Sequence, residues 1–241
     1  MKFNKILESI APHRHAVEKF DDFLRMAVCA FSMGKMEPEY EEVAKKYSKE
    51  EIKSFGDALG QLFLDYDEKS QDGAWKDVLG NYFEETGNSN ARMGQFFTPD
   101  SLCNMMAQIT AGEITRDNTT INDPTCGSGR NLIAHCRLAP DNRSKCFYTG
   151  SDLDYRCVLM TVINFVMYGM RGVVIHMDAL SMKVFKGYRI WMPETGLFVQ
   201  PLTAEECNRY LFEERQNVFD KTQPEIIETI SEQKQAQLTL W

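Results

Sequence analysis

Three short predicted strands in the second half of the chain are each followed by an acidic residue, and this pattern constrains the fold more than any other. The segments are Thr120–Asn122, Phe147–Gly150 and Val173–His176, and helical stretches separate them. Strands that alternate with helices predict an α/β fold with a doubly wound parallel sheet. Such sheets bind ligands in the crevice at the carboxyl ends of their strands.

The first strand runs into a turn with two glycines, Asp123–Gly129 (DPTCGSG), and a helix is expected from about Arg130. Glycine lets a backbone turn sharply and lets a ligand approach it closely. The first amides of a helix lack partners within the helix and attract negative charge. The turn therefore predicts a site for an anionic group; the alternative is a tight turn that binds nothing.

Asp152 follows the second strand and Asp178 the third. A carboxylate in the first position can accept hydrogen bonds from both ribose hydroxyls, and one in the second from an adenine amino group. The alternative for Asp152 is that it only caps the next helix. Three strand ends in this order are stronger evidence for a ligand site than a glycine turn alone.

The first ninety or so residues predict helices. Apolar residues recur at three- and four-residue spacing over Val17–Phe31 and Ile52–Tyr66, as in amphipathic helices. Ser48 and Glu51 form a capping-box pattern before the second stretch. A third helix is expected to contain Val78–Phe83. These apolar faces indicate core packing rather than chemistry.

Two further helices are expected around the sheet. One begins at Thr98 and Pro99, which resemble an N-cap followed by proline at the first helical position. The other is predicted over Ala204–Phe219. We expect the apolar residues of the first of these helices to face the core: Leu102, Met105, Met106 and Ile109.

The order of these motifs resembles that of adenine-specific DNA methyltransferases typified by the modification subunits of type I restriction-modification systems. The resemblance covers roughly residues 75 to 180. It implies a Rossmann-like, S-adenosyl-L-methionine (SAM)-dependent methyltransferase fold with SAM as the cofactor. The matching segments are Asp77–Tyr82 (DVLGNY), Gly94–Pro99 (GQFFTP), Asp123–Gly129, Gly150–Asp154 (GSDLD) and His176–Leu180 (HMDAL).

The resemblance also assigns each motif to a part of SAM. GQFFTP contacts its methionine and adenosine parts, and the glycine turn lines its methionine end. Asp152 holds the ribose and Asp178 the adenine. The implied cofactor-binding residues are Phe97, Thr98, Pro99, Asp123, Cys126, Gly127, Asp152 and Asp178.

Active members of that family carry Asn-Pro-Pro-Tyr or Asn-Pro-Pro-Phe after the fourth strand, where a flipped adenine stacks on the ring. The 241 residues contain no such motif. The best positional candidates for catalysis are Gln200 and Pro201, after an apolar run (Leu197–Val199) expected to be the fourth strand. Leu202 would replace the aromatic ring, which removes about 1–3 kcal/mol of base stacking. We therefore expect little or no adenine methylation.

The last five residues (QLTLW) resemble the peptide with which bacterial DNA-processing proteins bind the replicative sliding clamp. Two apolar anchors would fill a pocket while a glutamine fixes the register. The alternative is that they fold back onto the chain's own core, and short matches also arise by chance. The expected partner-binding residues are Gln237, Leu238, Leu240 and Trp241.

Composition limits the remaining possibilities. The net charge is −8, so we expect DNA to be bound with or through another subunit. Seven scattered cysteines form no CxxC pair, so neither a metal site nor disulfides are expected. No apolar run suits a membrane span and no signal peptide is evident, so a cytoplasmic setting is expected.

We expect three parts: an N-terminal helical region (1–92), a SAM-binding methyltransferase-like domain (93–222) and a mobile C-terminal tail (223–241). Three functions stay open. The first is that the chain is an adenine methyltransferase with an unorthodox or partner-supplied motif. Alternatively, it is an inactive SAM-binding or scaffold module recruited to replication or modification complexes. The third possibility is methylation of another substrate, such as a protein amide or RNA.

Overall fold

The computed structural model describes residues 2–71, 77–86, 97–110, 119–138, 145–191 and 198–212. The expected boundaries near residues 92 and 222, the motif residues Gly94–Phe96 and the whole segment 223–241 lie outside these ranges. The clamp-like residues Gln237 to Trp241 are therefore among the residues that the structure does not describe.

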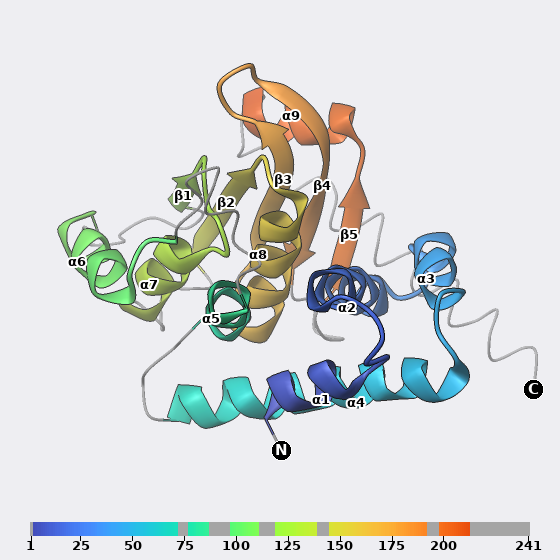
Figure 1. Ribbon diagram of the computed structural model, residues 1–241. Coiled ribbons are helices and arrows are strands. Elements are labelled where there is room, and N and C mark those ends of the chain that lie inside the picture. The colour runs from blue at the N-terminus through green and yellow to red at the C-terminus, as the bar shows by residue number, and fades with distance from the viewer. Residues whose placement is uncertain are drawn as a thin grey trace, which may run out of the picture.

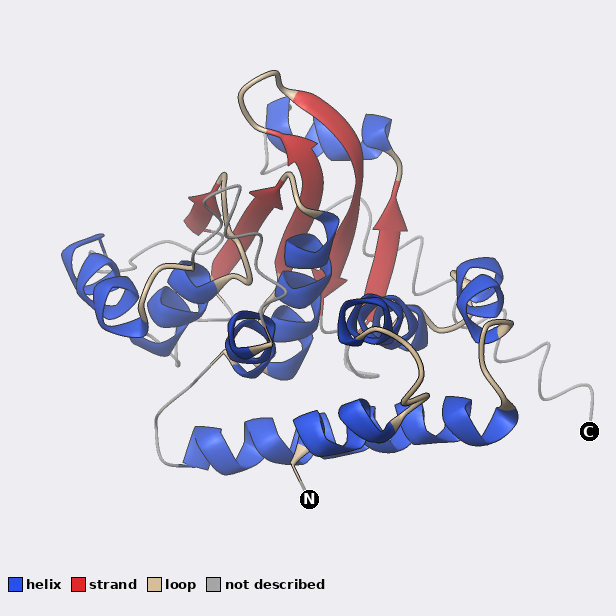
Figure 2. Cartoon of the chain, in the orientation of Figure 1, coloured by secondary structure: helices blue, strands red, loops and turns tan. Residues whose placement is uncertain are grey.

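A five-stranded sheet forms the centre of the described structure (Figures 1 and 2). Its strands lie in chain order, and the first three are parallel, as predicted. The last two run antiparallel to their neighbours, so the sheet is mixed rather than wholly parallel. The strands are β1 (Thr119–Asp123), β2 (Cys146–Asp152), β3 (Gly172–Asp178), β4 (Lys183–Trp191) and β5 (Phe198–Leu202).

Strand β4 was not expected from the sequence. Its second half is buried but contains Gly187 and Arg189, which break the apolar pattern of a buried strand. Gly187 is needed there because a Cβ would lie 2.9 Å from the carbonyl oxygen of Val174 on β3. The run Leu197–Val199, predicted to be the fourth strand, therefore overlaps the fifth strand, β5, at the edge of the described sheet.

Helices cover both faces of the sheet, which confirms the doubly wound α/β arrangement. Helices α7 (Arg130–Leu138) and α8 (Tyr155–Met167) connect the parallel strands on one face, and α9 (Ala204–Phe212) lies on the other (Figure 1). Tyr148 and Val174 belong to the main hydrophobic core, together with residues of α8. Phe147 and Ile175 belong to a second, smaller core, where they pack with Cys207 of α9. Alternate residues of one strand thus point to opposite helical layers.

The N-terminal helices contribute to the same main core as the sheet and α8; its residues range along the chain from Phe3 to Val199. Helix α2 packs on α8, and α1 packs on α4 (Figure 1). The predicted capping box is confirmed, because Ser48 N donates to Glu51 Oε2 (2.8 Å) and Glu51 N to Ser48 Oγ (3.2 Å). The helices are α1 (Phe3–Ser9), α2 (Ala16–Ala30), α3 (Glu37–Ala44), α4 (Lys49–Gln71) and α5 (Val78–Glu85).

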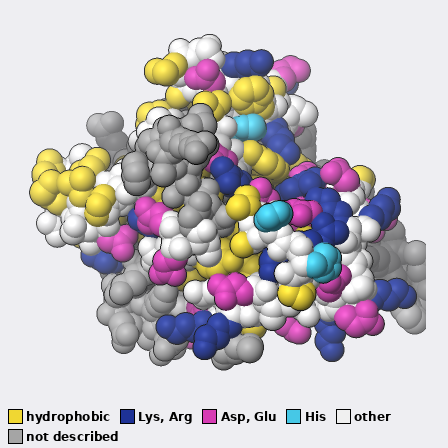
Figure 3. Space-filling model, viewed as in Figure 1, with side chains coloured by type: hydrophobic (Ala, Val, Ile, Leu, Met, Phe, Trp, Pro, Cys, Tyr) yellow, Lys and Arg dark blue, Asp and Glu magenta, His cyan; other side chains and the backbone are white. Residues whose placement is uncertain are grey.

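Helix α6 (Asp100–Thr110) begins close to the predicted residue, but the face predicted to point inward is wrong. The small residues Cys103 and Ala107 face the core instead, where they pack with Ala134 of α7. Figure 3 shows the resulting group of apolar side chains on the surface where α6 lies. The exposed residues are Leu102 (40%), Met105 (49%), Met106 (41%) and Ile109 (75%).

Across the described ranges, no helix combines the length and the apolar character that crossing a membrane requires.

Candidate functional site

The glycine turn between β1 and α7 adopts the backbone conformation that its sequence requires. Gly127 has a φ of 55° and Gly129 a φ of 90°, in the left-handed region that favours glycine. Cys126 N donates to Ser151 O at 2.8 Å, which fixes the turn against the end of β2. The turn therefore lies at the carboxyl edge of the sheet, as predicted.

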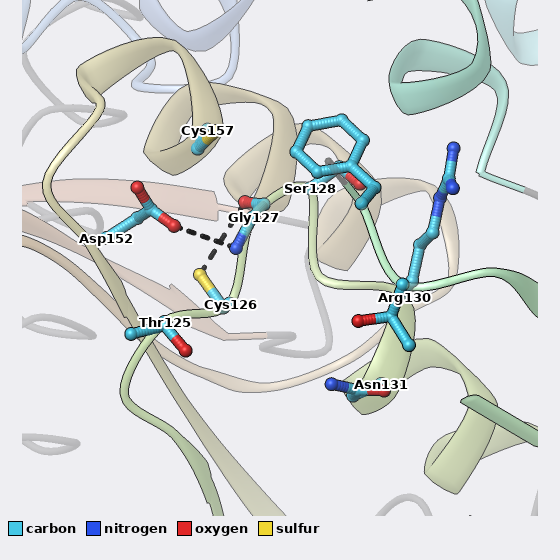
Figure 4. Close-up of a pocket in the computed structure, with 10 residues that line it drawn as sticks. Thr125, Cys126, Gly127, Ser128, Arg130, Asn131, Asp152 and Cys157 are labelled. Carbon is cyan, nitrogen blue, oxygen red and sulfur yellow. Dashed lines mark hydrogen bonds between the residues drawn. The ribbon is translucent and has the colours of Figure 1, made fainter. Parts of the chain in front are cut away.

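Asp152 joins the second strand to this turn (Figure 4). Its Oδ2 accepts a hydrogen bond from Gly127 N at 2.9 Å, and its Oδ1 accepts one from Asp154 N at 2.8 Å. Burial raises the pKa of the Asp152 carboxyl, and the two backbone donors partly offset this effect. The helix cap is Asp154, which accepts from Arg156 N at 2.9 Å, so Asp152 is not the cap of α8.

A cavity of about 160 Å³ lies between the glycine turn and Asp152. Whole-ligand sites usually measure about 300–1,000 Å³, so the described residues enclose only part of a nucleoside-sized ligand. Figure 4 shows the side chains around it. The lining residues are Phe97, Thr98, Thr125, Cys126, Gly127, Ser128, Arg130, Asn131, Asp152 and Cys157.

Five of the eight predicted cofactor-binding residues line this cavity: Phe97, Thr98, Cys126, Gly127 and Asp152. They come from the segment before α6, from the turn and from the end of β2. The turn and Asp152 lie about 25 residues apart in the sequence, and the parallel pairing of β1 with β2 brings them together. Pro99 stands at the start of α6, where its carbonyl accepts hydrogen bonds from the first turn of the helix.

The two other predicted acids do not line the cavity. Asp123 accepts hydrogen bonds from Thr125 N and from Asn131 Nδ2, both at 3.1 Å, and so holds the turn to the start of α7. Asp178 lies at the turn between β3 and β4 and accepts from Leu180 N at 3.0 Å. Hydrogen bonds from Ser181 lower the pKa of the Asp178 carboxyl.

Cys126 is buried at the cavity, with its Sγ 3.5 Å from Thr161 Oγ1. Burial raises the pKa of the Cys126 and Cys157 thiols, which keeps both sulfurs protonated and disfavours a nucleophilic role. No cluster of three or more His, Cys, Asp or Glu residues suited to a metal ion occurs in the parts of the chain that the structure describes.

The structure does not bring the predicted catalytic residues to the cavity. Gln200 and Pro201 lie within β5, where they pair with Arg189 and Tyr188 of β4. Two strands, β3 and β4, separate β5 from the strand that carries Asp152. The expectation that they follow the fourth strand is wrong, because the unpredicted β4 occupies that place in the sheet.

A buried polar network behind the turn was not expected from the sequence. Asp77, the N-cap of α5, accepts a short hydrogen bond from Ser128 Oγ and one from Arg130 Nε at 2.9 Å. Asn164 Nδ2 donates to Asp77 Oδ1 (3.0 Å) and to Ser128 O (2.7 Å). Gly80 must be glycine, because a Cβ would lie 1.7 Å from Asp77 Oδ2. The DVLGNY motif signalled this helix but not the buried network.

Comparisons with known proteins point to DNA methylases. Residues 74–195, half of the chain, match the family model described as N-6 DNA Methylase. The type I restriction enzyme MjaVIII methylase subunit of Methanocaldococcus jannaschii is 27% identical over 127 residues, covering 51% of this chain and 20% of that protein. This chain thus matches about a fifth of that relative's length.

One solved structure is also similar. The type I restriction-modification system methyltransferase subunit of Streptococcus thermophilus is 20% identical, with a TM-score of 0.41. The match covers 74% of this chain and 39% of that one.

Proposed function

Because this chain belongs to the N-6 DNA methylase family, we propose that it binds SAM, the cofactor implied by that family, between the glycine turn and Asp152. SAM supplies the methyl group in the reaction of this family. We further propose that the chain works within a type I-like system that methylates adenine in DNA. The observation that carries the proposal is the hydrogen bond from Gly127 N to Asp152 Oδ2, which joins two strand ends around one cavity.

The residues around the cavity suit SAM. The amides at the N-terminus of α7 favour a carboxylate, such as that of the methionine part. Asp152 is fixed by two backbone donors and keeps free lone pairs for ribose hydroxyls. Gly127 lets the ring of Phe97 pack against the turn at the cavity, since a Cβ there would lie 3.0 Å from that ring. For Asp178, a contact with the adenine of SAM stays a prediction.

We also propose that this chain does not methylate adenine with residues of its own. The Asn-Pro-Pro-aromatic motif is absent from its 241 residues. Gln200 lies in β5, which two strands separate from β2, and its buried Oε1 has no hydrogen-bond partner among the described residues. An acceptor for the adenine amine would therefore come from outside these 241 residues. This supports a cofactor-binding role within a larger assembly.

The test is a calorimetric titration of the protein with SAM. Asp152→Asn keeps one carbonyl acceptor for Gly127 N but removes the charge, and we expect SAM affinity to fall at least about tenfold. Asp57→Asn, the same substitution at an exposed position of α4, should leave it unchanged. No SAM binding by the wild type, or equal binding by the Asp152 variant, would overturn the proposed site.

The second part of the proposal needs a separate assay. Purified protein is incubated with tritiated SAM and duplex DNA rich in adenine, and label in the DNA is counted. We expect none above background from the chain alone. Label at N6 of adenine that survives in a Gln200→Ala variant would refute the need for a partner, and label lost in that variant would restore Gln200 as a catalytic residue.

A second candidate function rests on the sequence pattern QLTLW at residues 237–241. We propose that this peptide binds a bacterial sliding clamp, with Leu240 and Trp241 as anchors. A pull-down with purified clamp should retain the wild type and lose a Leu240→Ala/Trp241→Ala double variant. Equal retention of both proteins, or of neither, would contradict the proposal.

A further inference from the structure

Phe97 forms an aromatic wall of the cavity, and residues outside the strand ends determine its position. Its ring stacks on Phe83 of α5, with ring centroids 5.4 Å apart and planes inclined by 23°. It also lies against the turn, since a Cβ on Gly127 would come within 3.0 Å of two of its ring carbons. Phe97 therefore packs between α5 and the glycine turn.

Glu84 of α5 ties this wall to helix α7. Its Oε1 accepts a hydrogen bond from Phe97 N at 3.3 Å, and its Oε2 accepts one from Arg130 Nη2 at 2.7 Å. One carboxylate thus bridges the backbone of the wall and the guanidinium that follows the glycine turn. A charged acceptor makes both hydrogen bonds stronger than neutral ones.

Arg130 in turn contacts the ring that Glu84 holds. Its guanidinium carbon lies 5.2 Å from the centroid of Phe97, within the range of a cation–π contact. The guanidinium also donates hydrogen bonds to Asp77 Oδ2 (2.9 Å) and to Asn81 Oδ1 (2.9 Å). With only 8% of its surface exposed, Arg130 has little freedom to move away from the wall.

We propose that Glu84 and Arg130 are positioning residues that hold Phe97 against the cavity, so that SAM affinity depends on helix α5. The inference rests on the proposed function, because it assumes that this cavity binds SAM. A wall that is already fixed loses less conformational entropy when the ligand binds. Helix α5 therefore belongs to the cofactor site, although it lies within the region that the sequence assigned to an N-terminal helical part.

The first test compares substitutions on α5 by SAM titration. Glu84→Ala removes both hydrogen bonds, and we expect SAM affinity to fall about tenfold. Glu84→Gln keeps a carbonyl that accepts from Phe97 N, so it should restore part of the loss. Glu85→Ala, at the exposed neighbouring acid, should bind like the wild type. Wild-type affinity in the Glu84→Ala variant would overturn the proposal.

A second readout separates positioning from general stability. Val43→Ala opens a cavity in the buried core at α3, remote in sequence from the pocket, and should lower Tm while leaving SAM affinity unchanged. An equal loss of affinity in this variant would mean that stability alone explains the effect of Glu84.

A third readout works without SAM. A 4-fluorophenylalanine placed at residue 97 should change its ¹⁹F resonance in Glu84→Ala and in Arg130→Lys, because lysine lacks the planar fork that reaches Glu84. An unchanged resonance in both variants would refute the positioning role. If the wild type fails to bind SAM but the resonance shifts, then the proposed function fails while the Glu84–Arg130–Phe97 link stands.

Discussion

The two sides of the sheet differ in how closely their polar residues are connected. On the β1–β3 side, backbone and side-chain hydrogen bonds join the glycine turn, Asp152 and the buried acid Asp77. Among the described residues of the β4–β5 side, Gln200 Oε1 and Trp191 Nε1 are buried without hydrogen-bond partners; on the first side the same holds for Asn131 Oδ1 at the cavity. Buried polar groups are normally paired, and a dense network specifies one geometry. The network on the first side therefore supports the cofactor site that we propose there.

The two sides also differ in how deeply their ion pairs are buried. Arg130 is buried between Asp77 and Glu84 beside the cavity, whereas Arg209 and Glu205 form an exposed pair on α9. A buried pair is costly to break because it leaves an uncompensated charge, while an exposed pair contributes little. The difference predicts which substitutions the molecule tolerates.

The largest effect is expected for Arg130→Met. It leaves the Asp77 carboxylate buried without its cation and should lower the free energy of unfolding by about 3–5 kcal/mol. Arg209→Met, the same substitution in the exposed pair, should change it by less than about 1 kcal/mol. Urea denaturation followed by circular dichroism measures both. Similar losses in the two variants would remove the distinction between the two sides.

The next effect is expected for Gly127→Ala. A side chain at this positive φ costs about 1–2 kcal/mol, and the new methyl group presses on the Phe97 ring. We expect lower Tm and weaker SAM binding together. Gly56→Ala on α4, where a Cβ meets nothing within 4 Å, should instead raise stability by about 0.5–1 kcal/mol. Unchanged SAM affinity in the Gly127 variant would argue against close approach at this turn.

A smaller effect depends on pH. Burial raises the pKa of Asp21 on α2 to about 6; Asp154 and Asp22 act in the same direction, and Arg156 and Lys46 oppose it. An acid with a raised pKa favours the folded state most below its unfolded pKa, and this contribution is lost as pH rises through 6. Asp21→Asn should therefore be more stable than the wild type at pH 8, by roughly 1 kcal/mol after solvent screening.

The measurement for Asp21 is Tm as a function of pH. The gain of the Asn variant should vanish near pH 4, where the aspartate itself is protonated. A gain that stays constant between pH 4 and pH 8 would show that charge is not its cause.

The smallest effect is expected for Gln200→Leu. Removing a buried acceptor for which the described residues offer no donor should leave stability unchanged or raise it by up to about 1 kcal/mol. SAM affinity should stay at the wild-type value, because β5 does not line the cavity. A marked loss of SAM affinity would place Gln200 functionally at the cofactor site and would break the comparison between the two sides.

Local patterns predicted the turn, the cap and the strand ends better than they predicted the order of strands in the sheet. The glycine turn, the capping box at Ser48 and the strand ends before Asp152 and Asp178 depend on short-range sequence, and the structure places them as expected. Strand β4 could not be predicted in this way. Its Gly187 and Arg189 are buried only because β3 and α9 pack around them.

The buried network behind the glycine turn could not be predicted for the same reason. Nothing in the local pattern of DVLGNY indicates that Asp77 meets Ser128 and Arg130, about fifty residues later in the chain. Likewise, periodicity identified helix α6 but selected its large residues for the core. The close contact with α7 requires small ones, Cys103 and Ala107.

Hydrogen–deuterium exchange with and without SAM tests the central claim most directly, because it locates binding along the chain. The account predicts slower exchange in the presence of SAM for the amides of residues 125–131 and 152–157, with no change over 198–202. Protection over 198–202, or no protection anywhere at saturating SAM, would contradict a cofactor site between the glycine turn and Asp152.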